Sequence, residues 1–492
     1  MKKQIYNPYL PQGEYIPDGE PRVFGDRLYI FGSHDKFGTY QFCQNDYVSW
    51  SAPLSDLSDW TYGGVIYKRT QDPRNADGSH FMEAPDCVCY HGKYYLYYPL
   101  SGISSVAVAV ADCPEGPFAF YGLVRYPDGT PLGAREGDMW QFDPGVLVDG
   151  EDVWLYTGNG PLEKEDARHI GSQVMRLAED MLTITEEPKL LIPTVKTSAG
   201  TGFEGHEFYE ASSMRKIGDK YFFIYSSVLS HELCYAVSDR PDGGFRYGGT
   251  LVSNADIGYQ GRKDALAPVG NTHGSLCELN GQWYIFYHRQ TNSTFFARQG
   301  CAERVEIKGD KIGQAQMTSC GLNGGPLRGE GEYPAYIACV VVGAEGKNDY
   351  NLTDEMVKEY MHGYHSPLTD GWLEFTKTLP CITQDGQDCE TGKGAVQYVR
   401  HMLNGSCVGF RFFSFAGDVT VFVRTRGKGG AFSVSETLGG EPIGKIKFAP
   451  SSDWENSAPA RLCVGEGVHA LYFTYEGEES DFLSFTLEKT NG

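Results

Sequence analysis

One sequence element recurs five times in the first two thirds of the chain and limits the folds that it can adopt. Each copy has a turn glycine followed by a near-continuous run of aromatic and β-branched residues, which indicates a strand buried on both faces. The turn glycines lie 58 to 68 residues apart, and they are Gly25, Gly92, Gly150, Gly218 and Gly281. A repeat of this length holds four strands easily. The pattern therefore predicts an all-β fold of five similar sheets, and it favours a five-bladed β-propeller over a solenoid of the same period.

Charge and hydropathy limit the kinds of molecule that the chain can bind. It has 492 residues, of which 64 are acidic and 42 basic, so its formal net charge is −22 and it repels nucleic acids and anionic membranes. No segment approaches the roughly 18 apolar residues of a membrane span, and no apolar stretch follows Lys2 and Lys3 as in a signal peptide. We therefore expect a cytoplasmic protein that binds neither nucleic acid nor membrane, with no oligomeric state indicated. The 13 irregularly spaced cysteines favour reduced, mostly buried thiols.

An acidic or imidazole side chain precedes each turn glycine by six to eight residues. These side chains are Asp18, Asp86, Asp143, Glu210 and His273. The first strand of each blade lines the axis of a propeller, so five equivalent positions should converge there. Buried carboxylates are costly, and clustering raises some of their pKa values, which is how a site obtains an ionised base beside a protonated acid. The alternative is that each acid caps a turn at a blade edge, but four acids and one histidine in register favour catalysis.

Four of these segments resemble glycoside hydrolase family 43, a family of five-bladed propeller glycosidases. They are Asn7-Pro8 with Pro17-Asp18, and the residues 141–146, 208–216 and 270–275. The resemblance covers about residues 1–325 and implies that Asp18 is the general base, Glu210 the general acid, and Asp143 the residue that tunes the pKa of the acid. Asp18 is followed by Gly19-Glu20 where the family more often has proline, which keeps Glu20 as an alternative base.

The resemblance also implies further contacts around the site. Asp86 would line the pocket floor, Arg289 would contact a sugar hydroxyl, and His273 would hold a calcium ion or its water on the axis, with no organic cofactor. From their places beside these segments, Trp140 and Phe42 are candidate platforms for stacking on a sugar ring. Inverting hydrolysis needs an acid and a base about 6.5–9.5 Å apart.

Two nearby glutamates compete with Glu210 for the role of the acid. They are Glu204 and Glu207. Glu207 is odd in position relative to Glu210 along a strand of period two, so we expect its side chain to face away from the axis.

The last third of the chain follows a different pattern. A Gly/Pro-rich boundary at 321–334 separates a propeller of residues 1–325 from a second domain of residues 326–492. Short alternating strands there predict an antiparallel, jelly-roll-like β-sandwich, with one short helix at 354–362. The segments 467–473 and 481–485 are similar to a family 6 carbohydrate-binding module. The domain would bind sugar through exposed aromatics among Tyr398, Phe413 and Trp454, or it would brace the propeller.

The leading function is an inverting exo-glycosidase that removes terminal pentose residues from oligosaccharides of plant polysaccharides, as an α-L-arabinofuranosidase, a β-D-xylosidase or both. The alternatives are a catalytically silent sugar-binding propeller and a related glycosidase specific for galactosides or arabinan fragments. A WD-repeat-like scaffold is disfavoured because its Gly-His and Trp-Asp signature is missing.

Overall fold

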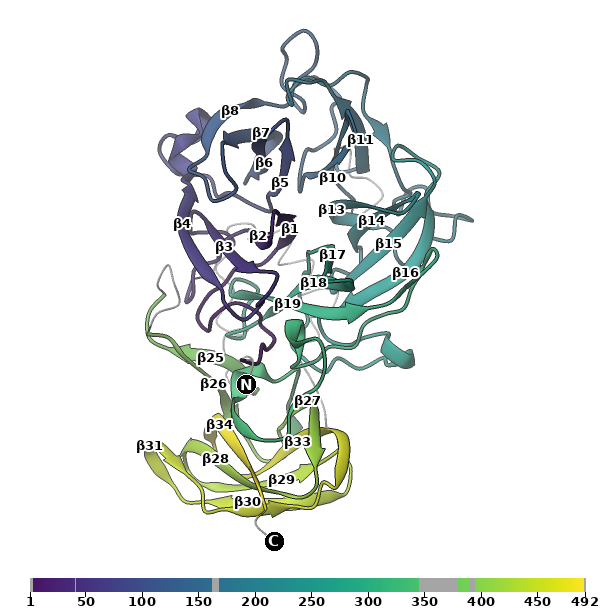
Figure 1. Cartoon of the computed structure of the whole chain (residues 1–492). Coiled ribbons are helices and arrows are strands. Elements are labelled where there is room, and N and C mark those ends of the chain that lie inside the picture. The colour runs from purple at the N-terminus through teal and green to yellow at the C-terminus, as the bar shows by residue number, and fades with distance from the viewer. Residues whose placement is uncertain (1–2, 40, 162–167, 345–378, 389–393, 491–492) are drawn as a thin grey trace.

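The computed structural model describes residues 3–39, 41–161, 168–344, 379–388 and 394–490. Five antiparallel sheets follow one another around a ring, and a pair of sheets lies beside it (Figure 1). The predicted all-β fold, a propeller followed by a sandwich, is confirmed.

Each blade of the propeller is a sheet whose strands pair in chain order. Blade I contains β1 (Glu20–Phe24), β2 (Arg27–Phe31), β3 (Tyr47–Pro53) and β4 (Thr61–Tyr67). Blade II contains β5 (Asp86–Tyr90), β6 (Lys93–Leu100), β7 (Ile103–Ala111) and β8 (Ala119–Leu123). Blade III contains β9 (Gly145–Asp149), β10 (Asp152–Asn159), β11 (Gly171–Leu177) and β12 (Lys189–Leu190). Blade IV contains β13 (Phe208–Ile217), β14 (Lys220–Ser227), β15 (Glu232–Ser238) and β16 (Arg246–Ser253). Blade V contains β17 (Leu276–Leu279), β18 (Gln282–Gln290) and β19 (Arg298–Val305), and a hairpin of β20 (Ile307–Lys308) and β21 (Lys311–Ile312) follows it.

The recurring aromatic runs form the second strand of every blade. In blade IV this strand is buried from Tyr221 to Ser227, because neighbouring blades cover both faces of the sheet. The turn glycines before these runs have left-handed backbones, with φ of 61° at Gly25 and 66° at Gly150. Tight hairpins require this conformation, and glycine adopts it without steric cost.

The N-terminal segment joins the last blade to the first. The backbone N–H of Tyr9 donates to the carbonyl of Gly300 in β19 at 3.2 Å. Asn7 accepts a hydrogen bond from the N–H of Ala302 (2.9 Å) and donates to Glu303 Oε1 (2.8 Å). The segment before blade I therefore lies along the outer strand of blade V and closes the ring.

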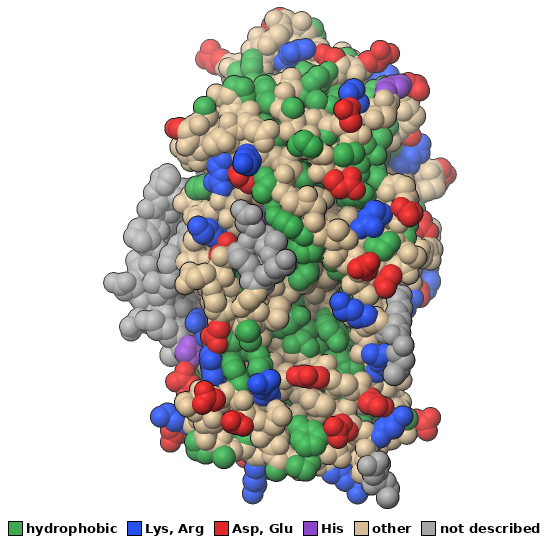
Figure 2. Space-filling model, turned by 60° about the vertical axis from the view of Figure 1, so that its left-hand side comes forward, with side chains coloured by type: hydrophobic (Ala, Val, Ile, Leu, Met, Phe, Trp, Pro, Cys, Tyr) green, Lys and Arg blue, Asp and Glu red, His purple; other side chains and the backbone are tan. Residues whose placement is uncertain are grey.

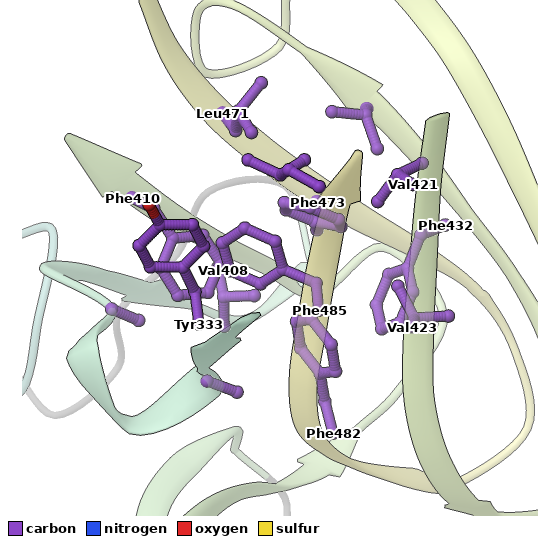
Figure 3. Close-up of a cluster of buried hydrophobic side chains, with 14 of the residues drawn as sticks. Tyr333, Val408, Phe410, Val421, Val423, Phe432, Leu471, Phe473, Phe482 and Phe485 are labelled. Carbon is purple, nitrogen blue, oxygen red and sulfur yellow. The ribbon is translucent and has the colours of Figure 1, made fainter. Parts of the chain in front are cut away.

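The C-terminal domain is a sandwich of two sheets. One sheet contains β22 (Leu327–Arg328), β24 (Val340–Val342), β27 (Cys407–Ala416), β29 (Gly430–Ser435), β30 (Pro442–Phe448) and β33 (Glu466–Gly477). The other contains β23 (Gly331–Pro334), β25 (Cys381–Asp385), β26 (Val396–Met402), β28 (Val419–Gly427), β31 (Ser451–Asn456), β32 (Ala460–Leu462) and β34 (Ser480–Lys489). Buried side chains of the two sheets meet in one core, of which Figure 3 shows Phe410, Phe473, Phe482 and Phe485.

Helices are short in the described part of the chain. They are the 3₁₀ turns η1 (Arg69–Gln71), η2 (Pro73–Asn75), η3 (Tyr259–Gly261), η4 (Gly321–Asn323) and η5 (Ala335–Ile337). None of the described helices is long and apolar enough to cross a membrane. The helix predicted at 354–362 lies outside the described residues.

The sandwich packs directly on the propeller. Leu266 of the propeller and Val340 and Tyr472 of the sandwich belong to one cluster of buried side chains. Arg411 of the sandwich pairs with Asp256 of the propeller at 2.5 Å, and both side chains are almost fully buried. The two domains therefore share apolar and charged contacts.

The candidate sugar-stacking aromatics of the sandwich are not flat exposed platforms. Phe413 is fully buried, and Tyr398 is buried as well. Trp454 is half-buried, and the guanidinium of Arg426 lies over both Trp454 (4.3 Å) and Tyr398 (4.6 Å). Arg426 therefore covers one face of each of these two rings.

Charge is spread over the surface of the molecule. Acidic and basic side chains are interspersed on the face drawn in Figure 2. The twelve cysteines in the described part of the chain are free thiols, and nine of them are buried.

Candidate active site

The strand ladders show which residues are equivalent in the five blades. β1, β5, β9, β13 and β17 each end in a residue paired across the hairpin turn. Six residues before these ends stand Asp18, Ala84, Asp143, Ala211 and His273. A register shift in β13 places Glu210, one residue before Ala211, in this ring of positions.

The backbone is unusual at three of these positions. Asp18, Asp143 and Ala211 have φ of 56°, 41° and 67°, in the left-handed region that residues with a side chain rarely adopt. Such conformations cost about 1–3 kcal/mol each and cluster at functional sites. The same strained position on three blades marks this end of the axis as the candidate active site.

Asp18 is held in the ionised form. Its Oδ1 lies 3.0 Å from Arg298 Nη1 and 3.3 Å from His288 Nδ1, and its N–H donates to the same nitrogen of His288 at 3.2 Å. Burial, the largest single influence, would raise the pKa of Asp18, but the positive charge of Arg298 and smaller contributions of neighbouring polar side chains together outweigh it, so the pKa lies below its ordinary value. An ionised carboxylate in this place suits a general base.

Glu210 has the opposite protonation tendency. Burial and the negative charge of Asp18 raise the pKa of Glu210 to about 7, although Arg298 opposes this rise. The side chain is half-buried, so it is accessible to solvent or ligand. Glu210 is therefore protonated in a large fraction of molecules near neutral pH, as a general acid must be.

Asp143 and His273 lie against each other on the axis. His273 Nδ1 is 3.6 Å from Asp143 Oδ2, and that oxygen accepts a hydrogen bond from the N–H of Ala211 at 3.0 Å. Burial and the charge of Glu210 raise the pKa of Asp143 well above its ordinary value. Asp143 thus touches the residue that follows Glu210, as expected for a residue that orients the acid.

Asp86 does not join this ring, which corrects its expected place on the pocket floor. It lies four residues before the end of β5, as Glu20 does in β1, so it belongs to the next layer down. The side chain is fully buried, and its oxygens bind Arg22 (2.5 and 2.9 Å) and the N–H of Val146 (2.8 Å). These bonds tie blades I, II and III together.

Glu83 is the carboxyl group of blade II that the sequence analysis missed. It stands one residue before Ala84, as Glu210 stands one residue before Ala211. Burial and the charges of Glu210 and Asp18 raise the pKa of Glu83 to about 8. The position of glycine in the hairpin turn could have indicated this residue. Gly92 is the second residue of its two-residue turn, whereas Gly25, Gly150 and Gly218 are the first residues of theirs.

Arg289 also differs from the expectation. It donates to the carbonyls of Ala338 (3.0 Å) and Tyr336 (2.7 Å), so it points to the sandwich. Its neighbour His288 faces Asp18, because successive side chains of a strand point to opposite faces. Burial lowers the pKa of His288 to about 3, so this imidazole is neutral.

The arginine at the site is Arg298, which the sequence analysis did not identify. Besides Asp18 it binds Asp35, with Nε 2.8 Å from Oδ2 and Nη2 2.9 Å from Oδ1. The three residues come from β19, from the segment before β1 and from the loop after β2, which no local motif connects.

The two candidate stacking residues lie on different blades. Phe42 is half-buried, with its ring 4.6 Å from the guanidinium carbon of Arg298 and 4.7 Å from the ring of Phe296. Trp140 is also half-buried, and its ring lies 5.2 Å from that of His169. Phe42 therefore belongs to the neighbourhood of Asp18, whereas Trp140 contacts His169 and Gln173 of blade III.

The other glutamates have local partners. Glu204 is exposed and accepts hydrogen bonds from the N–H groups of Gly200 and Gly202. Glu207 is buried and accepts from Ser198 Oγ at 2.6 Å. Glu20 pairs with Arg215 at 2.6 Å in the layer of Asp86. These contacts favour Glu210 as the acid and Asp18 as the base.

The residues beside His273 fit a small polar occupant. His273 Nε2 and Glu20 Oε1 are 4.0 Å apart, and both are buried atoms without a hydrogen-bond partner among the described residues. One carboxylate oxygen and one imidazole nitrogen are few ligands for calcium, which takes six to eight, so water would supply the others. Within the described part of the chain, one group of three potential metal ligands lies close together, namely His206, Glu232 and Cys234 in blade IV. Hydrogen bonds already join His206 and Cys234 to Glu232.

A five-bladed propeller with an ionised carboxylate and a protonated glutamic acid on its axis defines a glycoside hydrolase of the acid–base type. The model of glycosyl hydrolases family 43 matches residues 8–312, and the chain belongs to this family. The match ends at residue 312, so the likeness of the last domain to a carbohydrate-binding module stays a prediction.

Several named proteins and solved structures are also similar to this chain. A xylosidase/arabinosidase of Thermoclostridium stercorarium is 49% identical over 99% of both chains, and one of Bacteroides ovatus is 32% identical over 57% of this chain and 87% of its own. The family GH43_1 enzyme of Xanthomonas citri, solved with xylose, has 25% identity and a TM-score of 0.50 over 63% of this chain and 92% of that chain. A β-xylosidase/α-arabinofuranosidase from a compost metagenome, solved in a calcium-free form with xylotriose, has 25% identity and a TM-score of 0.48 over 61% of this chain and 94% of that chain.

Proposed function

We propose that this glycoside hydrolase is an inverting exo-enzyme that releases terminal pentose, β-D-xylopyranose or α-L-arabinofuranose, from short plant-derived oligosaccharides. The observation that carries the chemistry is the pair of opposed carboxyl groups: Asp18 with a lowered pKa and Glu210 with a pKa of about 7. The observation that carries the sugar is the similarity of the whole chain to a protein named xylosidase/arabinosidase.

The mechanism follows from the two protonation states. Glu210 gives its proton to the glycosidic oxygen while the bond between that oxygen and the anomeric carbon breaks. Asp18 takes a proton from a water molecule whose oxygen bonds to the anomeric carbon from the opposite face, so the configuration inverts. Arg298 keeps Asp18 ionised before this step. Asp143, bound to the N–H of Ala211, positions the backbone beside Glu210.

We propose in addition that calcium or water fills the space between His273 Nε2 and Glu20 Oε1. The two unpartnered atoms support this occupant. A bound calcium ion would supply positive charge that favours the ionised forms of nearby carboxylates. Removal of calcium with EDTA is then expected to lower the melting temperature, whereas an unchanged melt together with no metal in elemental analysis would leave water as the occupant.

Aryl glycosides test the proposed function. The wild-type chain should release nitrophenol from β-D-xylopyranoside or α-L-arabinofuranoside, and Glu210→Gln should lower kcat by about 10²- to 10⁴-fold with the fold intact. Glu204→Gln is the matched control, because Glu204 is exposed in the loop that precedes β13 and should keep wild-type activity. Sugar binding without release by the wild type would favour a silent propeller. Release from a galactoside alone would redirect the substrate, and normal activity of Glu210→Gln would refute the assignment of the acid.

A further inference from the structure

Asp388 of the sandwich contacts a loop of the first blade. Its Oδ1 accepts a hydrogen bond from the backbone N–H of Phe37 at 2.7 Å, and its Oδ2 accepts one from Asn45 Nδ2 at 3.2 Å. Phe37 and Asn45 both lie in the loop between β2 and β3, and Asn45 stands just before β3. One carboxylate from the other domain therefore holds this loop at two places.

The same loop carries groups that touch the candidate catalytic centre. The ring of Phe42 lies against the guanidinium of Arg298. The N–H of Cys43 donates to Asp35 Oδ1 at 3.0 Å, and Arg298 Nη2 lies 3.6 Å from Cys43 Sγ. Asn45, besides contacting Asp388, donates to the carbonyl of Asp35 at 3.0 Å. A movement of this loop would therefore reach Arg298 directly.

Other contacts place the sandwich beside this loop without Asp388. The hydroxyl of Tyr15 donates to Gln384 Oε1 at 2.7 Å and accepts from Gln397 Nε2 at 3.1 Å, and its ring stacks on Phe37. The buried pair of Arg411 and Asp256 holds the domains together elsewhere. Loss of the Asp388 carboxylate should thus free the loop while the sandwich stays docked.

We propose that Asp388 is a positioning residue of the glycosidase site, through which the sandwich sets the shape of the sugar-binding surface on blade I. This inference rests on the proposed function. Asp388 hydrogen-bonds Phe37 and Asn45 and not Asp18 or Glu210. It acts by holding the loop that presents Phe42 over Arg298. Arg298 keeps its contacts with Asp18 and Asp35 when Phe42 moves. The effect of Asp388 therefore falls on binding of the sugar and on discrimination between xyloside and arabinofuranoside more than on the proton transfers.

Steady-state kinetics of the full chain with both nitrophenyl pentosides test this role. Asp388→Ala should raise KM about five- to fiftyfold, because two hydrogen bonds to a charged group are lost, while kcat stays within about threefold. The ratio of kcat/KM between the two sugars should change in the same variant. Asp388→Asn keeps an acceptor for Phe37 and should lie between wild type and Asp388→Ala. Gln387→Ala, at the exposed neighbouring position, is the matched control and should behave as wild type.

The outcomes separate the two proposals. A wild-type chain inactive on every pentoside would contradict the proposed function itself. An active wild type, with Glu210→Gln inactive but KM and sugar preference unchanged in Asp388→Ala, would overturn the positioning role alone. A fall in kcat with unchanged KM in Asp388→Asn would also overturn it, since that result would place the residue in the chemical step.

Discussion

Removal of Arg298 should shift the pH range in which the enzyme works. Arg298 is the strongest opposing charge at Asp18, with 3.0 Å between Nη1 and Oδ1, and it also binds Asp35. In Arg298→Gln the buried carboxylates of Asp18 and Asp35 would lose the cation that they share, so the pKa of each would rise. The base would then be protonated, and inactive, at pH values where the wild type works.

The size of the shift follows from the geometry. Unit charges about 4 Å apart at an effective dielectric constant of about 20 attract each other by about 4 kcal/mol, which corresponds to about three pH units. Water that enters the space of the shortened side chain solvates Asp18 and reduces the shift, so we expect about one to two units. The pKa of Asp18 is lowered in the wild type, so its loss of charge limits activity on the acid side, and that limb should move to higher pH. Arg298 also lowers the pKa of Glu210, so the alkaline limb should move in the same direction.

The assay is kcat/KM for a nitrophenyl pentoside between about pH 3 and pH 9, with the release of nitrophenol read after quenching in base. Unpairing buried charges costs about 3–5 kcal/mol of stability, so each variant is first checked by thermal unfolding. Arg298→Lys should recover part of the wild-type profile, because one ammonium replaces one of the contacts. Arg304→Gln, exposed on the same strand, is the control. A folded Arg298→Gln variant with an unchanged acid limb would refute the electrostatic reasoning.

Three further predictions concern stereochemistry, electrostatics and stability. NMR of the first-formed sugar should show the anomer opposite to that of the substrate, and a retained configuration would contradict the roles of acid and base. Glu83→Gln should leave kcat/KM at pH 6 within about threefold, because a group with a pKa of about 8 is already neutral there; a hundredfold loss would assign Glu83 to the chemistry. Asp256→Asn should lower the free energy of unfolding by about 3–5 kcal/mol in urea titration, because it leaves Arg411 buried without its counter-ion. Asp418→Asn, which breaks an exposed pair, should cost less than about 1 kcal/mol, and equal losses in the two variants would contradict this ranking.

Site residues near the hairpin turns were predictable in part, because the turn glycine in the sequence marks where each first strand ends in the structure. Asp18, Asp143 and His273 are each six residues before the end of their strand, and the turn glycine marks that end closely enough. Asp86 was misplaced because it is the acidic residue six positions before Gly92, whereas Glu83 lies nine positions before that glycine, outside the spacing of the other blades. A one-position error moves a side chain to the other face of a strand, and a two-position error moves it one layer along the axis.

Arginine placement could not be predicted from local sequence. In Tyr287-His288-Arg289, the choice between His288 and Arg289 depends on which face of β18 meets the axis and which meets the sandwich, and this requires the packed domains. Arg298 has no motif, and its partner Asp35 is 263 residues away in the chain. The contact of Asp388 with Phe37 spans 351 residues.

The amino-acid sequence by itself determined the five-sheet architecture, the sandwich that follows it and the carboxyl groups at Asp18, Asp143 and Glu210, because hairpin turns and apolar runs are local and repeat. Only the tertiary structure decided which carboxyl of blade II joins them, which arginine holds the base ionised, and how Asp388 of the sandwich reaches blade I. These depend on closure of the ring and docking of the domains, which bring distant residues into a buried environment of low dielectric constant. There the distance between charges, and not their order in the chain, sets which group carries the proton.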